Sequence, residues 1–325
     1  MARVHSHTLP ELLARRRVLV VGDAILDVAY HGRALGPSVE NPAVTTYANE
    51  RIAYSYGGAS LVARNLLALG AAADYVTVLG DDANLEKCRA FSYPRLRFNT
   101  KVIESGRVNT VKERFWAGST LVFKWDFRDD RDIGAGAQRK MLSAVRQRLR
   151  GAVALVIADN RHGVLAGAVI PQLLAAAKRA KVPVYVDSQV TASRPSNHQS
   201  YRGADVICLN LKEAQAVSPA FQPERAEQDL WEIAENLGAT TVVVKLGEQG
   251  SVALANGEFI RTPAFRVSAM DAVGAGDAFI AALAAAHGTS WVTALAFANR
   301  WAALSTTVRG PNPPTLEAFR QSLAD

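Results

Sequence analysis

Ala152-Val153-Ala154-Leu155-Val156-Ile157-Ala158-Asp159-Asn160 is a short apolar run that ends in two polar residues. Three further runs have the same form: 17–21 before Gly22-Asp23, 182–186 before Asp187, and 205–209 before Asn210. Alanine-rich stretches with helical spacing alternate with them, which is the pattern of βαβ units around a mostly parallel sheet. We therefore predict an α/β fold in which a mostly parallel central sheet carries helices on both faces.

The polar residues at the ends of these runs predict one wall of a ligand site. In open α/β sheets the carboxyl ends of the strands face the ligand crevice. Asp23, Asp159, Asp187 and Asn210 each follow a predicted strand, so we expect their side chains at that edge. The alternative is that these residues only close turns or cap helices.

Two segments, 29–56 and 98–126, lack helical periodicity. The second alternates in hydrophobicity at 98–102 and again at 121–125. We predict that both segments form strands outside the main sheet and pair into a small β-lid over the crevice. Residues 1–28, 57–97 and 127–325 then make up the α/β domain.

Composition and charge exclude several other classes of protein. The 325 residues are 49% hydrophobic and 21% charged, as in an ordinary globular protein. No apolar run reaches the roughly 18 residues that a membrane-spanning helix needs, so we expect no membrane partner. Cys88 and Cys208 have no partners at metal-ligand spacing, and a cytoplasmic location is expected. The net charge is +7, but its one dense run, Arg15–Arg17, has no interleaved aromatic residues, so we expect no nucleic-acid partner.

The segment 269–279, which reads Ala269-Met270-Asp271-Ala272-Val273-Gly274-Ala275-Gly276-Asp277-Ala278-Phe279, carries the chemistry. Gly274, Ala275 and Gly276 precede a helix, so their N–H groups and the helix dipole predict an anion pocket. A carboxylate beside a bound phosphate is unfavourable unless it acts chemically, which makes Asp277 a candidate general base. The alternative is a glycine-rich turn with a purely structural role.

This segment resembles the second signature of the ribokinase-like, or PfkB, sugar kinase family. Three more elements resemble that family in the expected order: 57–65, with Gly57, Gly58 and Asn65; 210–213, with Asn210 and Glu213; and the strand and turn 244–250. Within the family, the stretches 20–27, 155–160, 182–187 and 210–214 are most similar to kinases of D-glycero-D-manno-heptose 7-phosphate. The resemblance implies a ribokinase-like fold with a β-lid and ATP-dependent phosphorylation of a sugar or sugar phosphate.

The resemblance also implies roles for individual residues. Asp277 is the base, and Gly274, Ala275 and Gly276 stabilise the transferring phosphoryl group. The implied nucleotide site in the α/β domain consists of Asn210, Glu213, Lys245, Gly247, Gly250, Asp271 and Asn299, with Glu213 holding Mg²⁺ through water. The implied substrate site consists of Asp23, Asp27, Gly57, Gly58, Lys112, Arg114 and Asp159. We expect ATP and Mg²⁺ as cofactors, with a monovalent cation as a further option, and we predict a homodimer.

Lys112 and Arg114 stand two apart in a predicted strand, so they share a face and can bring two cations to an anionic substrate. The alternative is an ordinary polar strand face. The chain departs from the family pattern at Leu61, where Asn is usual, at Gln189, where Lys is usual, and at Val273, where Thr is usual. Leu cannot pair with a sugar hydroxyl and Gln cannot neutralise a phosphate, so these departures bear on the substrate.

Two other functions stay open at this point. One is a protein of the same fold that binds or regulates with weak catalysis, which Leu61 and Gln189 favour and Asp277 and Glu213 oppose. The other is a hexose or nucleoside kinase of the same family.

Overall fold

The computed structural model describes residues 13–191 and 194–323 of the chain. Residues 1–12, 192–193 and 324–325, which the predicted α/β domain includes, lie outside the described residues.

The main sheet has nine strands in the order β13-β12-β11-β10-β9-β8-β1-β4-β5. The bounds are β1 Arg17–Gly22, β4 Ala72–Gly80, β5 Leu96–Glu104, β8 Ala154–Asp159, β9 Val184–Ser188, β10 Val206–Asn210, β11 Thr241–Lys245, β12 Ser251–Ala255 and β13 Glu258–Thr262. Neighbours from β11 to β5 pair in parallel, and β12 and β13 return antiparallel at one edge. The predicted mostly parallel α/β sheet is confirmed.

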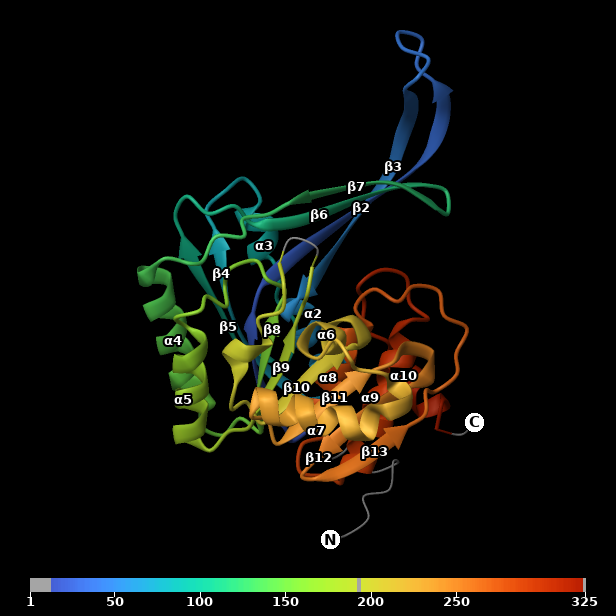
Figure 1. Ribbon diagram of the computed structural model, residues 1–325. Coiled ribbons are helices and arrows are strands. Elements are labelled where there is room, and N and C mark those ends of the chain that lie inside the picture. The colour runs from blue at the N-terminus through green and yellow to red at the C-terminus, as the bar shows by residue number, and fades with distance from the viewer. Residues whose placement is uncertain (1–12, 192–193, 324–325) are drawn as a thin grey trace.

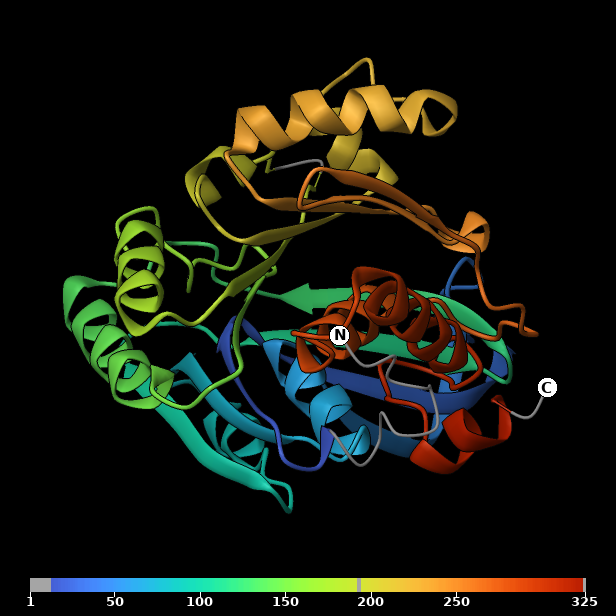
Figure 2. The ribbon, with the colours of Figure 1, turned by 90° about the horizontal axis from the view of Figure 1, so that it is seen from below.

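Helices cover both faces of this sheet because successive strand residues point to opposite sides. Leu19 and Val21 of β1 pack with α4 (Ala135–Leu149), α5 (Ile170–Ala180) and α7 (Ala226–Leu237). Val18 and Val20 pack with α2 (Ala59–Ala68), α8 (Ala275–Ala285) and α9 (Trp291–Ser305). Figure 2 shows α7 in orange on one side of the sheet and α8 and α9 in red on the other. The described residues also form three shorter α-helices: α3 Leu85–Arg89, α6 Leu211–Val217 and α10 Leu316–Gln321.

A second sheet forms the lid, with the order β3-β2-β6-β7. Its strands are β2 Ala24–Pro37, β3 Thr45–Gly58, β6 Thr110–Ala117 and β7 Thr120–Phe127. β2 pairs with β6 in parallel, which joins two segments that are far apart in the sequence. In Figure 1 the ends of β2 and β3 project well beyond the rest of the molecule. The predicted small β-lid is confirmed.

The predicted lid boundaries need a correction. Residues 98–104 belong to β5, which pairs with β4 at the edge of the main sheet, so placing the start of segment 98–126 in the lid is wrong. The lid pairing also extends further than predicted, from Ala24 to Gly58 in place of 29–56. Alternating hydrophobicity predicts a strand with one buried face. A strand at the edge of the main sheet can have one buried face just as a lid strand can, so the pattern does not distinguish the two.

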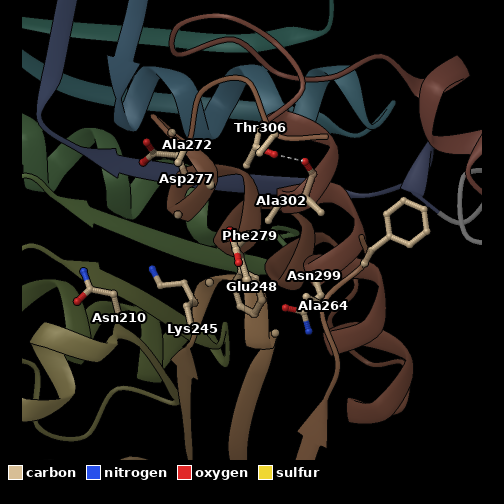
Figure 3. A pocket seen from close by; sticks show the side chains of 18 of the residues that line it. Asn210, Lys245, Glu248, Ala264, Ala272, Asp277, Phe279, Asn299, Ala302 and Thr306 are labelled. Carbon is tan, nitrogen blue, oxygen red and sulfur yellow. Dashed lines mark hydrogen bonds between the residues drawn. The ribbon is translucent and has the colours of Figure 1, made fainter. Parts of the chain in front are cut away.

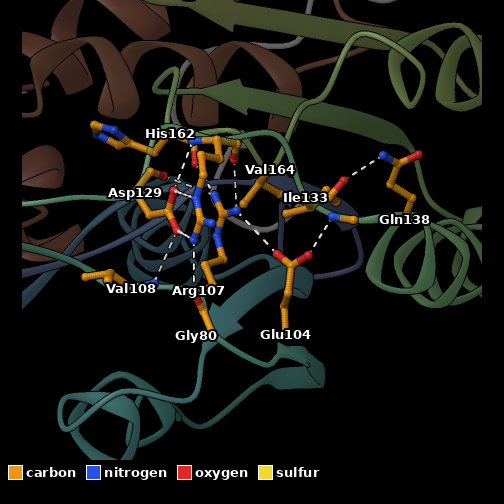
Figure 4. Close-up of polar contacts among 12 residues, drawn as sticks. Gly80, Glu104, Arg107, Val108, Asp129, Ile133, Gln138, His162 and Val164 are labelled. Atoms are coloured by element: carbon orange, nitrogen blue, oxygen red, sulfur yellow. Dashed lines mark hydrogen bonds and ion pairs between the residues drawn. The ribbon is translucent and has the colours of Figure 1, made fainter.

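Arg107 fastens the base of the lid to the body (Figure 4). Its guanidinium donates to the carbonyl oxygens of Arg131 (2.9 Å), Asp129 (3.2 Å) and His162, and it pairs with Glu104 at 3.3 Å. These partners belong to the link after β7, the loop after β8 and the end of β5. The segment that leads into β6 and the segment that leaves β7 therefore meet at one buried arginine.

None of the helices in the described ranges 13–191 and 194–323 has the length and apolar character needed to cross a membrane.

Candidate active site

The turn before α8 is held in shape by Asp271. Gly274 caps the helix with φ 84°, a backbone conformation that glycine adopts at low cost. Asp271 Oδ1 accepts a hydrogen bond from the Val273 N–H (3.0 Å), and its Oδ2 accepts one from the Gly310 N–H (3.0 Å). The first N–H groups of α8 then face the same point as the positive end of the helix dipole, which favours an anion there.

A cavity of about 920 Å³ lies between this turn and the carboxyl ends of β9, β10 and β11. Figure 3 shows Asn210 and Lys245 at the strand ends and Asn299 and Thr306 at the other side of the cavity. The predicted residues among its lining are Asn210, Glu213, Lys245, Gly247, Gly250, Gly274, Ala275, Gly276, Asp277 and Asn299. The structure thus brings together residues from four separate parts of the sequence.

Asp277 is partly buried at the start of α8. Burial raises the pKa of its carboxyl to about 8, and Asp187 adds to the rise. Lys245 at the strand ends and Lys112 of the lid lower the same pKa, while Asp27 of the lid raises it. The carboxyl therefore lies within electrostatic range of both the sheet edge and the lid.

Lys245 forms an ion pair with Asp187 directly beside the anion turn. A Cβ atom on Gly276 would lie 3.3 Å from Lys245 Nζ, so the absence of a side chain there makes room for the ammonium group. Burial alone would lower the pKa of Lys245, but the carboxylates of Asp187 and Glu213 raise it above its usual value. The ammonium group is therefore charged at neutral pH and available to an anion in the turn.

Asn210 and Glu213 bond to each other at the start of α6. Asn210 Oδ1 accepts from the Glu213 N–H (2.9 Å), and Glu213 Oε2 accepts from the Asn210 N–H (2.7 Å). Burial raises the pKa of Glu213 to about 7, and Asp187 adds to the rise. Asn210 thus caps α6 and also lines the cavity with Glu213, so the capping alternative does not exclude the predicted ligand role.

The far end of the cavity is closed by the turn after β11 and by α9. Gly250 has φ 88°, and a Cβ atom there would lie 2.1 Å from the Thr262 carbonyl oxygen, so this close approach requires glycine. Asn299 Nδ2 donates to Ser251 Oγ (2.9 Å), and Asn299 and Phe265 both line the cavity.

Asp27 and Gly57 are diagonal neighbours in the lid, where Asp27 is the register partner of Ser55 and Gly57 that of Ile25. They belong to the paired strands β2 and β3, and a Cβ atom on Gly57 would lie 2.5 Å from Asp27 Oδ2. Burial raises the pKa of Asp27 to about 6, while Lys112 and Arg114 lower it. Glycine at position 57 therefore leaves space for a carboxylate that faces the cations of the lid.

Lys112 and Arg114 share one face of β6, as predicted from their spacing. Lys112 is the register partner of Asp27, and Arg114 makes a 2.7 Å ion pair with Asp126 of β7. Among the described residues, no ion pair within 4.0 Å engages Lys112. The two cations therefore differ: Arg114 is partly neutralised, whereas Lys112 is not.

The substrate role predicted for Asp23 needs correction. Asp23 is 1% exposed, and its carboxylate oxygens accept from the N–H groups of Asn160 (2.8 Å), His162 (3.3 Å) and Val164 (3.1 Å). Gly58 lies against the same residue, because a Cβ atom on Gly58 would lie 2.5 Å from the Asp23 carbonyl oxygen. Asp23 and Gly58 position the loop after β8 and do not face an open site.

Asp159 is likewise engaged within the protein. Its Oδ2 accepts hydrogen bonds from Ser188 Oγ (3.0 Å), Asn197 Nδ2 (2.8 Å) and the Tyr201 hydroxyl (2.8 Å). Its predicted contact with substrate is therefore wrong for this conformation, and the turn-closing alternative applies. Asp159 Oδ1 accepts from the Arg161 N–H (2.9 Å), so four donors occupy the roughly four lone-pair sites of this buried carboxylate.

Sequence reasoning placed Asp187 at the strand-end wall without giving it a role and gave none to Glu248 or Phe265, although all three line the cavity. Asp187 carried a signal, since it follows a predicted strand. Nothing in the local sequence marks Glu248 or Phe265, because only the packing of the turn after β11 and the segment after β13 brings them to the cavity.

A family model described as pfkB family carbohydrate kinase matches residues 132–318, which is more than half of the chain. The chain belongs to the pfkB family of carbohydrate kinases. It is thus a phosphotransferase with an alcohol group as acceptor, and the predicted family and enzyme class are confirmed.

Two similar curated proteins are bifunctional. This pfkB-family chain is 31% identical over 319 residues to the Bifunctional protein HldE of Rhodopseudomonas palustris, covering 96% of the chain and 64% of that protein. It is 30% identical over 316 residues to the Bifunctional protein HldE of a Nitratiruptor species, covering 94% of the chain and 64% of that protein. The chain therefore spans less than two thirds of the length of these relatives.

Solved structures of two kinases share the fold. The structure of Arabidopsis thaliana ribokinase complexed with ribose and ATP superimposes with a TM-score of 0.73 at 21% identity, covering 95% of this chain and 99% of that one. Phosphofructokinase-2 from Escherichia coli in complex with potassium gives a TM-score of 0.76 at 20% identity, covering 95% and 98%. At this level of identity the likeness establishes the ribokinase-like fold of the pfkB-family chain.

Proposed function

We propose that this kinase transfers the γ-phosphoryl group of ATP to a hydroxyl of an anionic sugar, with a heptose 7-phosphate as the first acceptor to test. One observation carries the proposal: Asp277 lies at the anion turn and is influenced by Lys245 from the strand ends and by Lys112 from the lid. A carboxyl group in that position faces a nucleotide on one side and a lid-bound acceptor on the other. The similarity to the HldE proteins and the heptose kinase-like stretches of the sequence support the choice of acceptor.

In the proposed reaction, the Asp277 carboxylate takes the proton of the acceptor hydroxyl as its oxygen attacks the γ-phosphorus. The N–H groups of Gly274, Ala275 and Gly276 donate to the oxygens of the transferring group. Lys245 offers its charge at the same point. Asp27 and Lys112 orient the acceptor from the lid, so that the reacting atoms are held in line.

Mg²⁺ fits this site through water and not as a directly caged ion. No group of three or more His, Cys, Asp or Glu side chains in the described part of the chain could hold a metal. Glu213 and Asn210 both line the cavity beside the anion turn, so these two residues would hold the metal's waters. Bound there with the nucleotide, Mg²⁺ would neutralise phosphate charge. The potassium complex of the Escherichia coli enzyme supports including a monovalent cation in the assays.

The decisive test is Asp277→Asn. This change keeps the size of the side chain and removes the proton acceptor, so turnover should fall by roughly 100-fold to 10,000-fold while ATP still binds. Turnover is measured as ADP release over a panel of heptose 7-phosphate, other sugar phosphates, free hexoses and nucleosides. Unchanged turnover would contradict the role of Asp277.

The same panel separates the alternatives. Preference for a free hexose or a nucleoside would favour the other members of the family. Binding of ATP and a sugar phosphate without ADP release in any combination would favour a binding or regulatory protein.

We also propose that the kinase is a homodimer that pairs through the outer face of the lid. Ile52, Tyr54, Phe123, Trp125 and Phe127 are exposed there. A contiguous aromatic face of this kind is typical of a protein interface. Light scattering should give twice the 34.9 kDa chain mass, and Trp125→Glu should give the monomer. A monomeric wild-type protein would contradict this proposal.

A further inference from the structure

We infer that Arg51 of the lid and Arg309 of the body form a clamp for a phosphate group at the remote end of the acceptor. The inference rests on the proposed kinase function and names how that site selects its substrate. It starts from a row of side chains across the lid. His31 of β2 is the register partner of Arg51 in β3 and of Trp116 in β6.

The body reaches this row through Arg309. The Arg309 guanidinium lies over the Trp116 ring, 5.9 Å from its centroid, and the Trp116 and His31 rings stack at 6.5 Å. Burial lowers the pKa of His31, and both Arg51 and Arg309 lower it further. Two arginines, Arg51 from the lid and Arg309 from the body, therefore approach the same imidazole.

Positive charges outnumber negative charges around this row of lid side chains and Arg309. Among the described residues, no carboxylate lies within 4.0 Å of Arg51 or Arg309, whereas Arg33 of β2 pairs with Glu50 of β3 at 3.3 Å. The cations on the acceptor-facing side are Arg51, Arg64, Lys112, Arg114, Lys124 and Arg309, against the carboxylates of Asp27 and Asp126. Like charges on lid and body repel each other, and an anion between them removes that repulsion. A phosphate dianion suits two guanidinium groups particularly well.

Arg309 is also fixed in place relative to the reacting centre. The next residue, Gly310, donates its N–H to Asp271, which holds the anion turn. Pro311 and Asn312 accept hydrogen bonds from Arg64 of α2 at 2.8 and 2.6 Å. The position of the clamp is therefore tied through short contacts to the turn that precedes Asp277.

The spacing sets the length of the acceptor. His31 follows Asp27 by four residues on the same strand, which is about 13 Å at the usual rise of about 3.3 Å per residue. Arg51 and Arg309 lie at the His31 end of this span. A sugar whose reacting hydroxyl lies at Asp277 and whose phosphate is at the other end of the carbon chain would reach both, whereas an unphosphorylated sugar would leave the clamp open.

The first test compares two acceptors, the best phosphorylated sugar of the panel and its dephosphorylated counterpart. Arg309→Gln and Arg51→Gln should each raise KM for the phosphorylated acceptor about tenfold, because one charged hydrogen-bonding partner is lost. The KM for ATP and the KM for the dephosphorylated sugar should stay unchanged. Arg33→Gln is the matched control, since it removes a lid charge that is already paired. Equal effects on both acceptors, or none on either, would overturn the clamp.

The second test does not depend on turnover. Because Arg309 lies over Trp116, binding of inorganic phosphate to the wild-type protein should change the tryptophan emission in a saturable way, and Trp116→Phe should abolish the change. The change should also be absent in Arg309→Gln and present in Arg33→Gln. A phosphate response that survives Arg309→Gln would overturn the inference. If no sugar were phosphorylated at all, the proposed function would fail while this titration would still decide the clamp.

Discussion

Leu61 packs directly beneath Gly274, so that a Cβ atom at position 274 would lie 2.5 Å from Leu61 Cδ2. Leu61 is 1% exposed and is absent from the cavity lining. The expectation that Leu61 leaves a sugar hydroxyl unpaired therefore needs revision, because its side chain supports the anion turn. The residue affects substrate choice only through the shape of that turn.

Gly274→Ala tests this packing. The new methyl group would collide with Leu61, and the left-handed φ would add strain of about 1 kcal/mol or more. We expect turnover to fall at least tenfold. In the double variant with Leu61→Ala the collision is gone but the strain remains, so turnover should recover in part. No recovery in the double variant would show that strain alone accounts for the loss, which steady-state kinetics with melting curves can decide.

The pH dependence of the reaction should reflect the raised pKa of Asp277, which is about 8. Below that pH the carboxyl is protonated and cannot accept a proton, so kcat/KM for the acceptor should rise about tenfold per pH unit and level off near pH 8. A pH–rate profile from 5.5 to 9.5 measures this. Asp277→Asn serves as the control and should lack the rise. A wild-type profile that is flat above pH 6 would contradict the assignment.

Substitutions can transfer the positive charge beside the anion turn from position 245 to position 189. Among the described residues, Lys245 is the only lysine or arginine at the strand-end side of the cavity lining. Lys245→Gln should therefore lower kcat/KM by about 100-fold as a charged contact to phosphate is lost. Gln189 also lines the cavity, so adding Gln189→Lys should restore part of the activity.

Asp187→Asn provides the comparison for that experiment, because Lys245→Gln also leaves the Asp187 carboxylate without its ion pair. If Lys245 only neutralises Asp187, the variant with both Lys245→Gln and Asp187→Asn should be active. If Lys245 serves the phosphate, that variant should stay inactive.

Lys112 and Arg114 should contribute unequally. Arg114 is already paired with Asp126, whereas Lys112 faces Asp27 and influences Asp277. Lys112→Gln should therefore raise KM for an anionic acceptor more than Arg114→Gln does, by a factor of about three to ten. Initial rates at saturating ATP measure both. The reverse order would indicate that Arg114 leaves Asp126 when substrate binds.

Local sequence was sufficient for the parallel sheet and the anion turn. Each depends on residues close together in the chain: apolar runs of five to seven residues define the strands, and Gly274 with the helix after it defines the turn. The four predicted strand ends lie within two residues of the observed ones, and they meet at one edge because neighbouring strands are parallel. The capping bonds of Asn210 and Glu213 follow from their spacing of three residues.

Only the tertiary structure decided which of those strand-end side chains are available. Asp23 and Asp187 both lie at the carboxyl ends of buried strands, yet Asp23 is enclosed by three N–H donors of a loop more than 130 residues away, whereas Asp187 pairs with Lys245 in the open cavity. The assignment of β5 to the main sheet was likewise decided by its pairing with β4. Sequence determines which groups are present at each strand end, but free lone pairs and strand partners depend on contacts between distant segments, which no local pattern encodes.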